Sequence, residues 1–269
     1  MRHTCQSCII QISVRILKRW VRQKLGAAGY VVFNSRRAGV YAQDGIFTFH
    51  NSNFLRKPSF KAAYQRGVQA SRGVDPQFEW RVHVALWAAR SAVRVQGDFV
   101  ECGVNAGFMS SAIMHSLGWQ RIEKVFFLID TFSGPVLSQY SDEEVQRGQM
   151  KVAQDAMAKG AYVMDPDLAR ANFAEWPNVE IVQGVVPDVL EQLKVDRVAF
   201  LHLDMNCARP ERAAFEYFWE KLSPGGVVLL DDYAAYGYDA LVKAIDDAAG
   251  VREAEVLSLP TGQGLIWKH

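Results

Sequence analysis

From Gly97 to the C-terminus, short runs of apolar residues alternate with segments in which apolar residues recur every three or four positions. The apolar runs predict strands at 98–103, 124–130, 178–184, 197–204, 225–232, 254–259 and 264–268. The periodic segments predict helices at about 107–118, 141–160, 187–193, 209–222 and 237–249. Strands that alternate with helices indicate an α/β fold whose parallel sheet is covered on both faces.

Three parts of the chain depart from this alternation. Only the stretch Leu259–Gln263 separates the last two apolar runs, so we expect a hairpin that adds an antiparallel strand. Residues 131–177 form a long insert between the second and third strands, and such inserts are usually lids or binding loops. Residues 1–95 are irregular at first and then predict two helices. We therefore expect a helical N-terminal extension or lid (1–95) and one α/β domain (96–269).

Residues 9–25 have the pattern of a basic amphipathic helix. Apolar side chains recur on one face, and basic ones are interleaved with them: Ile9, Ile12, Ile16 and Trp20, with Arg15, Lys18, Arg19, Arg22 and Lys24. Such a helix is suited to an anionic membrane surface, and the alternative is a helix packed on its own domain or on an oligomer partner. The charges argue against a signal peptide, and no apolar run is long enough to span a bilayer. We expect a cytoplasmic protein, with a peripheral contact at the inner membrane surface as the further alternative.

The composition narrows the class of protein only moderately. Of the 269 residues 49% are apolar and 22% charged, which is ordinary for a soluble globular protein and excludes disorder over most of the chain. A net charge of +1 argues against a nucleic-acid partner. The lone C-x-x-C of Cys5 and Cys8 lacks the second pair of ligands that a zinc site needs.

The first predicted strand runs directly into a glycine-rich turn. Glu101, Gly103 and Gly107 form an E-x-G-x-x-x-G pattern, with Asn105 inside the turn. Glycines let the backbone approach a ligand closely, and the first turn of the following helix offers amide donors. The pattern differs from the G-x-G-x-x-G of dinucleotide-binding enzymes.

The next two strands end in residues that suit a nucleoside. Asp130, followed by Thr131, closes the second strand, where a carboxylate accepts hydrogen bonds from ribose hydroxyls in nucleotide-binding sheets. The alternative is an aspartate that caps a helix or a turn. Gln183 and Gly184 close the third strand, at the place where an adenine ring would lie.

Three carboxylates follow the fourth and fifth strands. Asp204 closes the fourth strand, and Asp231 with Asp232 closes the fifth. Neighbouring parallel strands lie about 4.8 Å apart, so these groups can converge, and they repel one another unless a cation or shared protons neutralise them. Oxygen ligands favour Mg²⁺, with Mn²⁺ or Ca²⁺ as alternatives. Adjacent residues of a regular strand point to opposite faces, so both Asp231 and Asp232 can bind a metal only if the chain bends there; otherwise one of them caps a helix. We expect His202 to be a buried core histidine.

Together these motifs resemble a class I S-adenosylmethionine-dependent methyltransferase. More closely, the chain resembles the macrocin O-methyltransferase (TylF/MycF/NovP-type) family, which methylates sugar hydroxyls on macrolide and aminocoumarin natural products. The stretches that carry the resemblance are GDFVECGVNAG (97–107), IDTFSG (129–134), LHLDMNCARPE (201–211) and LSPGGVVLLDDY (222–233). The resemblance implies a Rossmann-like, seven-stranded sheet of order 3-2-1-4-5-7-6 with the last strand antiparallel, a bound divalent metal and a homo-oligomer.

The resemblance also implies roles for single residues. It places metal ligands at Asp204, Asp231 and Asp232, and cofactor contacts at Glu101, Gly103, Gly107 and Asp130. One position departs from the family pattern, because Asn206 stands where a second acid often follows the fourth strand. The segment from Trp80 and Arg81 to His83 also has the look of this family, with a role in cofactor binding or in helix packing.

We therefore predict a metal-dependent O-methyltransferase that transfers a methyl group from S-adenosylmethionine to a hydroxyl of a sugar, a glycosylated natural product or a glycan. A metal-bound hydroxyl has a lowered pKa, and Asp204 is the expected base as well as a ligand. Catechol-like phenols share this metal chemistry. Two other classes remain as alternatives: a nicotinamide-dependent oxidoreductase, and a non-catalytic cofactor-binding protein in glycan assembly.

Overall fold

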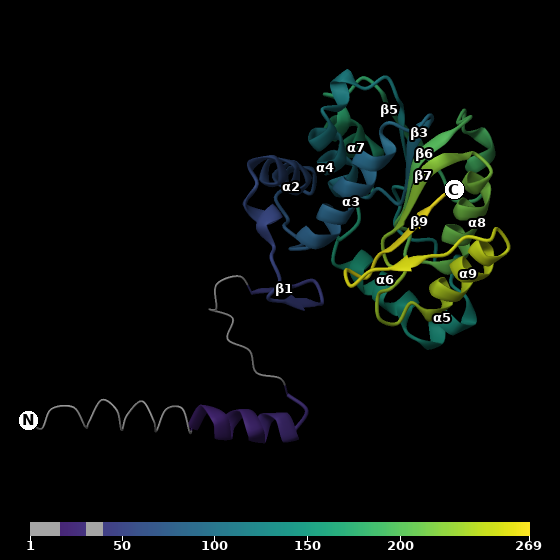
Figure 1. Ribbon diagram of the computed structural model, residues 1–269. Helices are drawn as coiled ribbons and strands as arrows, with labels where there is room; N and C mark the ends of the chain where they lie inside the picture. The colour runs from purple at the N-terminus through teal and green to yellow at the C-terminus, as the bar shows by residue number, and fades with distance from the viewer. Residues whose placement is uncertain (1–16, 31–39) are drawn as a thin grey trace, which may run out of the picture. The chain divides into compact units, whose positions relative to one another are not determined.

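The computed structural model describes residues 17–30 and 40–269, so Cys5, Cys8 and the first part of the predicted helix 9–25 lie outside the described residues. The chain divides into two compact units, Met1–Ala42 with Phe47–Asn51, and Gln43–Ile46 with Ser52–His269. In the first unit residues 17–27 form a helix, drawn in purple in Figure 1. Among the described helices, none is long and apolar enough to cross a membrane.

A seven-stranded sheet forms the centre of the second unit. Its strands are β3 (Asp98–Cys102), β4 (Phe126–Asp130), β5 (Val179–Gln183), β6 (Val198–Leu203), β7 (Leu222–Leu230), β8 (Leu257–Ser258) and β9 (Gly264–Trp267). They are arranged β5-β4-β3-β6-β7-β9-β8, which is the predicted order 3-2-1-4-5-7-6. The first five are parallel, and β9 runs antiparallel to both β7 and β8 (Figure 1). The predicted fold class and terminal hairpin are confirmed.

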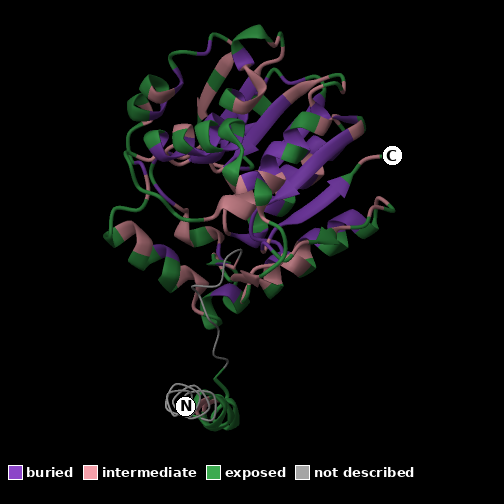
Figure 2. Ribbon diagram, turned by 60° about the vertical axis from the view of Figure 1, so that its left-hand side comes forward, coloured by how far each residue is buried: buried purple, intermediate pink, exposed green. Residues whose placement is uncertain are grey.

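Successive side chains of a strand point to opposite faces of the sheet, and here both faces carry apolar residues. Helices therefore cover both faces. Phe99 and Phe200 face one hydrophobic core and Val100 and Leu201 the other. The first core is shared with α2 (Pro58–Ala70), α3 (Glu79–Ala92) and α4 (Phe108–Leu117), and the second with α8 (Ala208–Trp219) and α9 (Asp239–Gly250). Figure 2 shows the strands as the most buried part of the chain. Since α2 and α3 help to cover the sheet, the second compact unit begins well before the predicted boundary at residue 95.

The insert between β4 and β5 is made of short helices. These are η3 (Leu137–Gln139), α5 (Asp142–Gln146), α6 (Gln149–Ala158) and α7 (Pro166–Phe173). The single helix predicted over 141–160 is wrong, because the chain turns at Gly148, whose φ is +83°. The segment predicted as a helix at 187–193 contains only the 3₁₀ turn η4 (Leu190–Gln192).

The remaining elements are short and were not predicted. β1 (Tyr41–Gln43) and β2 (Ile46–Thr48) form a two-stranded sheet around the turn residues Asp44 and Gly45, both with positive φ. The turns η1 (Asn53–Arg56) and η2 (Trp119–Arg121) complete the set. Strands of three residues are too short to show the alternation from which a strand is predicted.

Candidate active site

Three carboxylates meet where β6 and β7 end. One oxygen each of Asp204, Asp231 and Asp232 lie within 4.8 Å of one another. β6 ends at Leu203 and β7 at Leu230, so all three aspartates follow their strands. The backbone is therefore not held in strand geometry at Asp231 and Asp232, and both side chains reach the same cluster, as the metal-site prediction requires.

Arg81 of α3 lies against two of these carboxylates. Its Nη1 donates to Oδ2 of Asp231 at 2.8 Å and to Oδ1 of Asp232 at 2.9 Å, while its Nε donates to Oδ2 of Asp44 at 2.9 Å. Burial opposes the charge of the guanidinium, but Asp231 and the other two acids outweigh this cost and raise the pKa of Arg81. Sequence reasoning left the role of Arg81 open, and the structure shows that it binds the acid pair.

Two carboxyl groups of the acid cluster hold their protons more tightly than a free aspartate does. Burial and the charges of Asp231 and Asp232 raise the pKa of Asp204 well above its usual range, and burial with Asp231 raises that of Asp232 to about 6. Burial acts on Asp231 in the same direction, but the His202 imidazole and the Arg81 guanidinium lower its pKa overall. A cluster of hard oxygen donors whose charge is only partly balanced fits a divalent cation such as Mg²⁺.

His202 is fully buried behind this cluster, between two carboxylates. Its Nδ1 lies 2.8 Å from Oε1 of Glu101, its neighbour across the β3–β6 ladder. Its Nε2 lies 3.7 Å from Oδ1 of Asp231, which is too long for a hydrogen bond but close enough for charges to interact. Burial lowers the pKa of His202, yet the two acids raise it overall. Glu101, predicted to contact a cofactor, is 2% exposed and turns toward His202.

At two glycines of the predicted turn, a side chain would collide with a neighbouring residue. Gly103 and Gly107 have φ values of +89° and +82°. A Cβ on Gly103 would lie 1.9 Å from the main-chain oxygen of Asp204, and one on Gly107 would lie 2.3 Å from Cζ of Phe173. Gly103 thus allows the turn after β3 to approach the first carboxylate of the cluster, and Gly107 allows α7 to pack on the start of α4.

Asp130 binds the glycine turn from the end of β4. Its Oδ2 accepts hydrogen bonds from the backbone amides of Val104 at 2.7 Å and Asn105 at 2.8 Å, and its Oδ1 accepts from Phe132 N at 2.8 Å. The amides of Val104 and Asn105, which precede α4, are therefore not free for a ligand, whereas the expected donors of the first turn of α4 stay a prediction. The reason is that β3 and β4 are adjacent and parallel, so their carboxyl ends meet.

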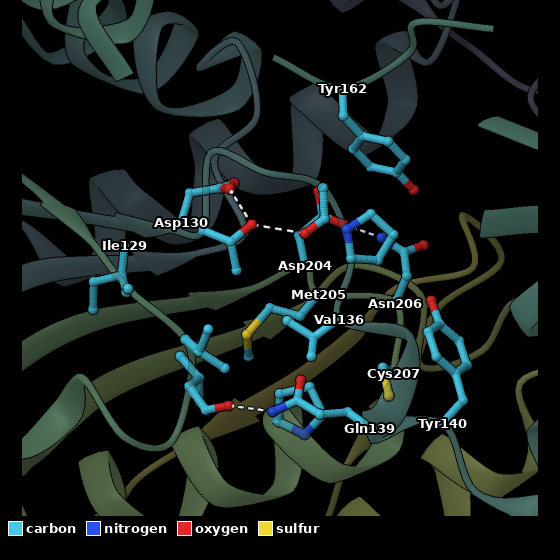
Figure 3. Close-up of a pocket in the computed structure, with 18 residues that line it drawn as sticks. Ile129, Asp130, Val136, Gln139, Tyr140, Tyr162, Asp204, Met205, Asn206 and Cys207 are labelled. Carbon is cyan, nitrogen blue, oxygen red and sulfur yellow. Dashed lines mark hydrogen bonds between the residues drawn. The ribbon is translucent and has the colours of Figure 1, made fainter. Parts of the chain in front are cut away.

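A first pocket lies over the carboxyl ends of β3, β4 and β6 (Figure 3). Five residues of the predicted site line it: Gly103, Asp130, Thr131, Gly184 and Asp204. Gln183 is not on this wall; it is exposed, and its Nε2 donates to the main-chain oxygen of Thr131 at 3.3 Å.

A second pocket, of about 440 Å³, lies beside the first. Its walls include the apolar side chains Val74, Phe78, Phe108 and Met109. Asp204 and Tyr162 line both pockets, and Asp231 lines the second. The two pockets therefore share Asp204 and Tyr162 as lining residues.

The side chain of Asn105 forms two hydrogen bonds to the insert. Its Nδ2 donates to the main-chain oxygen of Ala161 at 3.0 Å, and its Oδ1 accepts from Val163 N at 2.8 Å. Tyr162 stands between these two residues in the chain, and its ring borders the pocket above Asn206 (Figure 3). Burial and then the charge of Asp204 raise the pKa of Tyr162. Asn105, predicted as a cofactor contact, is thus a residue that positions the insert and lines the second pocket.

Glu211 orders the loop after Asp204, and sequence reasoning missed it. Its Oε1 accepts hydrogen bonds from the amides of Met205 at 3.0 Å and Asn206 at 2.9 Å. Burial and nearby acids raise the pKa of Glu211 to about 8. Asn206 in turn donates to Oδ1 of Asp204 at 3.1 Å and accepts from the Tyr238 hydroxyl at 3.0 Å. The only available signal for Glu211 was an acid in the first turn of a predicted helix.

A seven-stranded sheet of this order, with a glycine turn after its first strand and acids after the neighbouring strands, defines a Rossmann-like class I methyltransferase. The macrocin-O-methyltransferase (TylF) family model matches residues 84–258, and the chain belongs to that family. It is therefore an O-methyltransferase, which confirms the resemblance found in the sequence and favours it over the two other classes.

Individual relatives agree with this assignment. The 8-demethyl-8-(2,3-dimethoxy-alpha-L-rhamnosyl)-tetracenomycin-C 4'-O-methyltransferase of Streptomyces olivaceus is 28% identical over 183 residues, which cover 65% of this chain and 67% of that protein. The solved structure of the O-methyltransferase NovP has a TM-score of 0.58 at 19% identity over 70% of this chain and 79% of its own. CalS11, a calicheamicin methyltransferase, has a TM-score of 0.53 at 16% identity over 88% of this chain and 98% of its own. At these identities the two structures show a shared fold.

Proposed function

We propose that the chain transfers the methyl group of S-adenosylmethionine to a hydroxyl of a sugar carried by a natural product or glycan, with the help of a divalent cation. The observation that carries this proposal is the position of Asp204, which lines both pockets and belongs to the acid cluster. The Streptomyces olivaceus relative is named for methylation at the 4' position of a rhamnosyl-bearing compound, which supports a sugar acceptor.

The first pocket suits the methyl donor. Gly103 and Gly184 form part of its wall, and Asp130 supplies a carboxylate at the end of β4. A carboxylate accepts about four hydrogen bonds. The amides of Val104, Asn105 and Phe132 use three of these positions on Asp130. The Thr131 hydroxyl lies 3.4 Å from Oδ1 of Asp130 but donates over a shorter distance, 2.7 Å, to the main-chain oxygen of Gly134. We therefore propose that Asp130 binds one ribose hydroxyl of the donor rather than two.

The acid cluster suits the cation and the proton that the acceptor loses. Bound by Asp204, Asp231 and Asp232, a divalent cation would lower the pKa of an acceptor hydroxyl. Arg81 holds Asp231 and Asp232 in place. Asp204 is the candidate base, because it is the carboxylate-bearing residue of the cluster that lines both pockets. Oδ1 of Asp204 accepts a hydrogen bond from Asn206, so Oδ2 is the oxygen that we assign to the acceptor proton.

The reaction takes place where the two pockets meet. The acceptor oxygen forms a bond to the methyl carbon as the bond from that carbon to the donor sulfur breaks, and the hydroxyl proton passes to Asp204. The products are the methyl ether and S-adenosylhomocysteine. Tyr162 borders both pockets, and the apolar walls formed by Phe78, Phe108 and Met109 fit the part of the acceptor that carries the sugar. Alignment of the acceptor oxygen with the methyl group contributes strongly to the reaction rate, because the sulfonium donor is already activated.

Titration calorimetry and mass spectrometry test the proposal. S-adenosylmethionine should bind to the protein alone, and rhamnosides should bind measurably only when Mg²⁺ is present. Mass spectrometry should then show a rhamnoside or a glycan that gains one methyl group, with catechols assayed in parallel. Methylation of catechols but of no sugar would overturn the acceptor class, and absence of donor binding would overturn the whole proposal.

A further inference from the structure

The N-terminal segment carries a charge opposite to that of the remaining chain. Residues 1–43 contain eight Lys and Arg residues and no Asp or Glu, and the first acidic residue is Asp44. This leaves 22 of the 30 basic residues against all 29 acidic ones in the remaining chain. A net charge of +1 therefore hides a strongly basic segment, which is available for a polyanionic surface.

The helix over 17–27 presents this charge beside an apolar face. Leu17, Val21 and Leu25 are spaced four residues apart, so they lie along one face, and Trp20 flanks them. Leu17 and Trp20 are 60% and 55% exposed. The helix carries four exposed cations and no acid: Lys18, Arg19, Arg22 and Lys24. Exposed apolar side chains and cations thus share one short helix.

We propose that helix 17–27 lies on the surface of an anionic lipid bilayer. An apolar face with a tryptophan enters the boundary between lipid headgroups and acyl chains, and the cations bind the anionic headgroups. A nucleic acid would attract the cations but would leave Leu17 and Trp20 in water. The long stem of Lys24, near the apolar face, allows its charge to reach the headgroups. This contact would hold the enzyme at a membrane independently of methyl transfer.

Vesicle flotation of the full chain tests the proposal. We expect binding to vesicles that contain phosphatidylglycerol, no binding to phosphatidylcholine alone, and weaker binding as salt increases. Replacing the four cations with Gln (K18Q/R19Q/R22Q/K24Q) should lower binding at least tenfold. The variant L17S/W20S should also lower binding, since it removes the apolar contact. The matched control R56Q/K61Q/R121Q/K159Q changes four exposed cations of the second unit and should bind like the wild type.

Any of four results would overturn the proposal. Equal binding to both kinds of vesicle, or full binding by the four-cation variant, would exclude an electrostatic membrane contact. Binding to single-stranded RNA that L17S/W20S does not change, without binding to vesicles, would indicate a polyanion site. A lower oligomer mass of L17S/W20S, without vesicle binding by the wild type, would assign the apolar face to a second copy of the chain. Equal melting temperatures of all variants would show that the changes act on binding.

Discussion

The Nη1 atom of Arg81 lies 2.8 Å from Oδ2 of Asp231 and also donates to the main-chain oxygen of that residue at 3.2 Å. The two residues are 150 positions apart in the chain, so the contact joins α3 to the loop that follows β7. It places a fixed positive charge inside a cluster of carboxylates. Arg81 therefore stabilises the acid cluster when no metal is bound and competes with a metal for the same two carboxylates.

Replacing Arg81 with Gln should destabilise the metal-free protein by about 3 kcal/mol, because buried carboxylates lose their counter-charge. Saturating Mg²⁺ should restore most of this stability, and the affinity for Mg²⁺ should increase, because the competing cation is gone. Urea unfolding in chelator and in Mg²⁺ measures both effects. Arg66→Gln is the matched control: Arg66 is similarly buried and also forms an ion pair, with Glu175. A stability loss in Arg81→Gln that Mg²⁺ does not restore would contradict the account.

Gly103→Ala should abolish binding of both donor and metal. The added Cβ meets the main-chain oxygen of Asp204 at 1.9 Å, and φ is +89°, so either the turn or Asp204 must move. Gly148→Ala is the control: it has a similar φ of +83° but no atom within 4 Å of the new Cβ, and it should cost only about 1 kcal/mol. Calorimetry with S-adenosylmethionine and Mg²⁺ makes the comparison. Normal binding by Gly103→Ala would show that the turn is not part of the site.

Asn105→Ala should release the segment of the insert that carries Tyr162. Two hydrogen bonds to Ala161 and Val163 are lost, so hydrogen exchange over 160–165 should become faster and kcat/KM should fall about tenfold. The control is Asn178→Ala, which removes the bond to the main-chain oxygen of Ile122 away from both pockets. Both variants should lose about 1 kcal/mol of stability. An unchanged kcat/KM in Asn105→Ala would show that these two hydrogen bonds have no catalytic role.

Glu211→Gln should remove part of the pH dependence of stability. The pKa of Glu211 is raised from 4.5 to about 8 in the folded protein, so between these values the folded state holds a proton that the unfolded state releases. This contribution to stability is complete below pH 4.5 and is lost as the pH rises toward 8. In chelator, the variant should therefore be more stable than the wild type near pH 8.5 by on the order of 1–3 kcal/mol, with a smaller difference near pH 5. Unfolding curves that differ equally at both pH values would contradict the raised pKa.

The site residues that could be predicted from the sequence are those that follow the ends of strands. Asp130, Asp204 and Asp231 each follow an apolar run, and parallel strands bring their carboxyl ends to one edge of the sheet. The same reasoning predicted the strand order only with the help of the family resemblance. It also left undecided whether Asp231 and Asp232 both reach the cluster, because whether the chain bends after Leu230 depends on where β7 ends.

Contacts that the sequence analysis missed or left open join elements whose relative positions periodicity does not give. Arg81 comes from α3, and its partner Asp44 comes from a turn between two strands of three residues each. Glu211 accepts hydrogen bonds from the backbone amides of the loop after Asp204, and the Asp130 carboxylate accepts them from the amides of the glycine turn. These contacts depend on tertiary packing and on exact loop geometry, so the residue pattern of one segment does not reveal them.

Methyl transfer with and without a divalent cation tests the central claim most directly. Labelled S-adenosylmethionine would be incubated with the protein and a panel of rhamnosides that includes the rhamnosyl-tetracenomycin of the Streptomyces olivaceus relative. We predict that a chelator lowers the rate at least about 100-fold and that Mg²⁺ restores it in the wild type, but not in Asp204→Asn, Asp231→Asn or Asp232→Asn. Undiminished transfer to a sugar in the presence of the chelator would contradict the account.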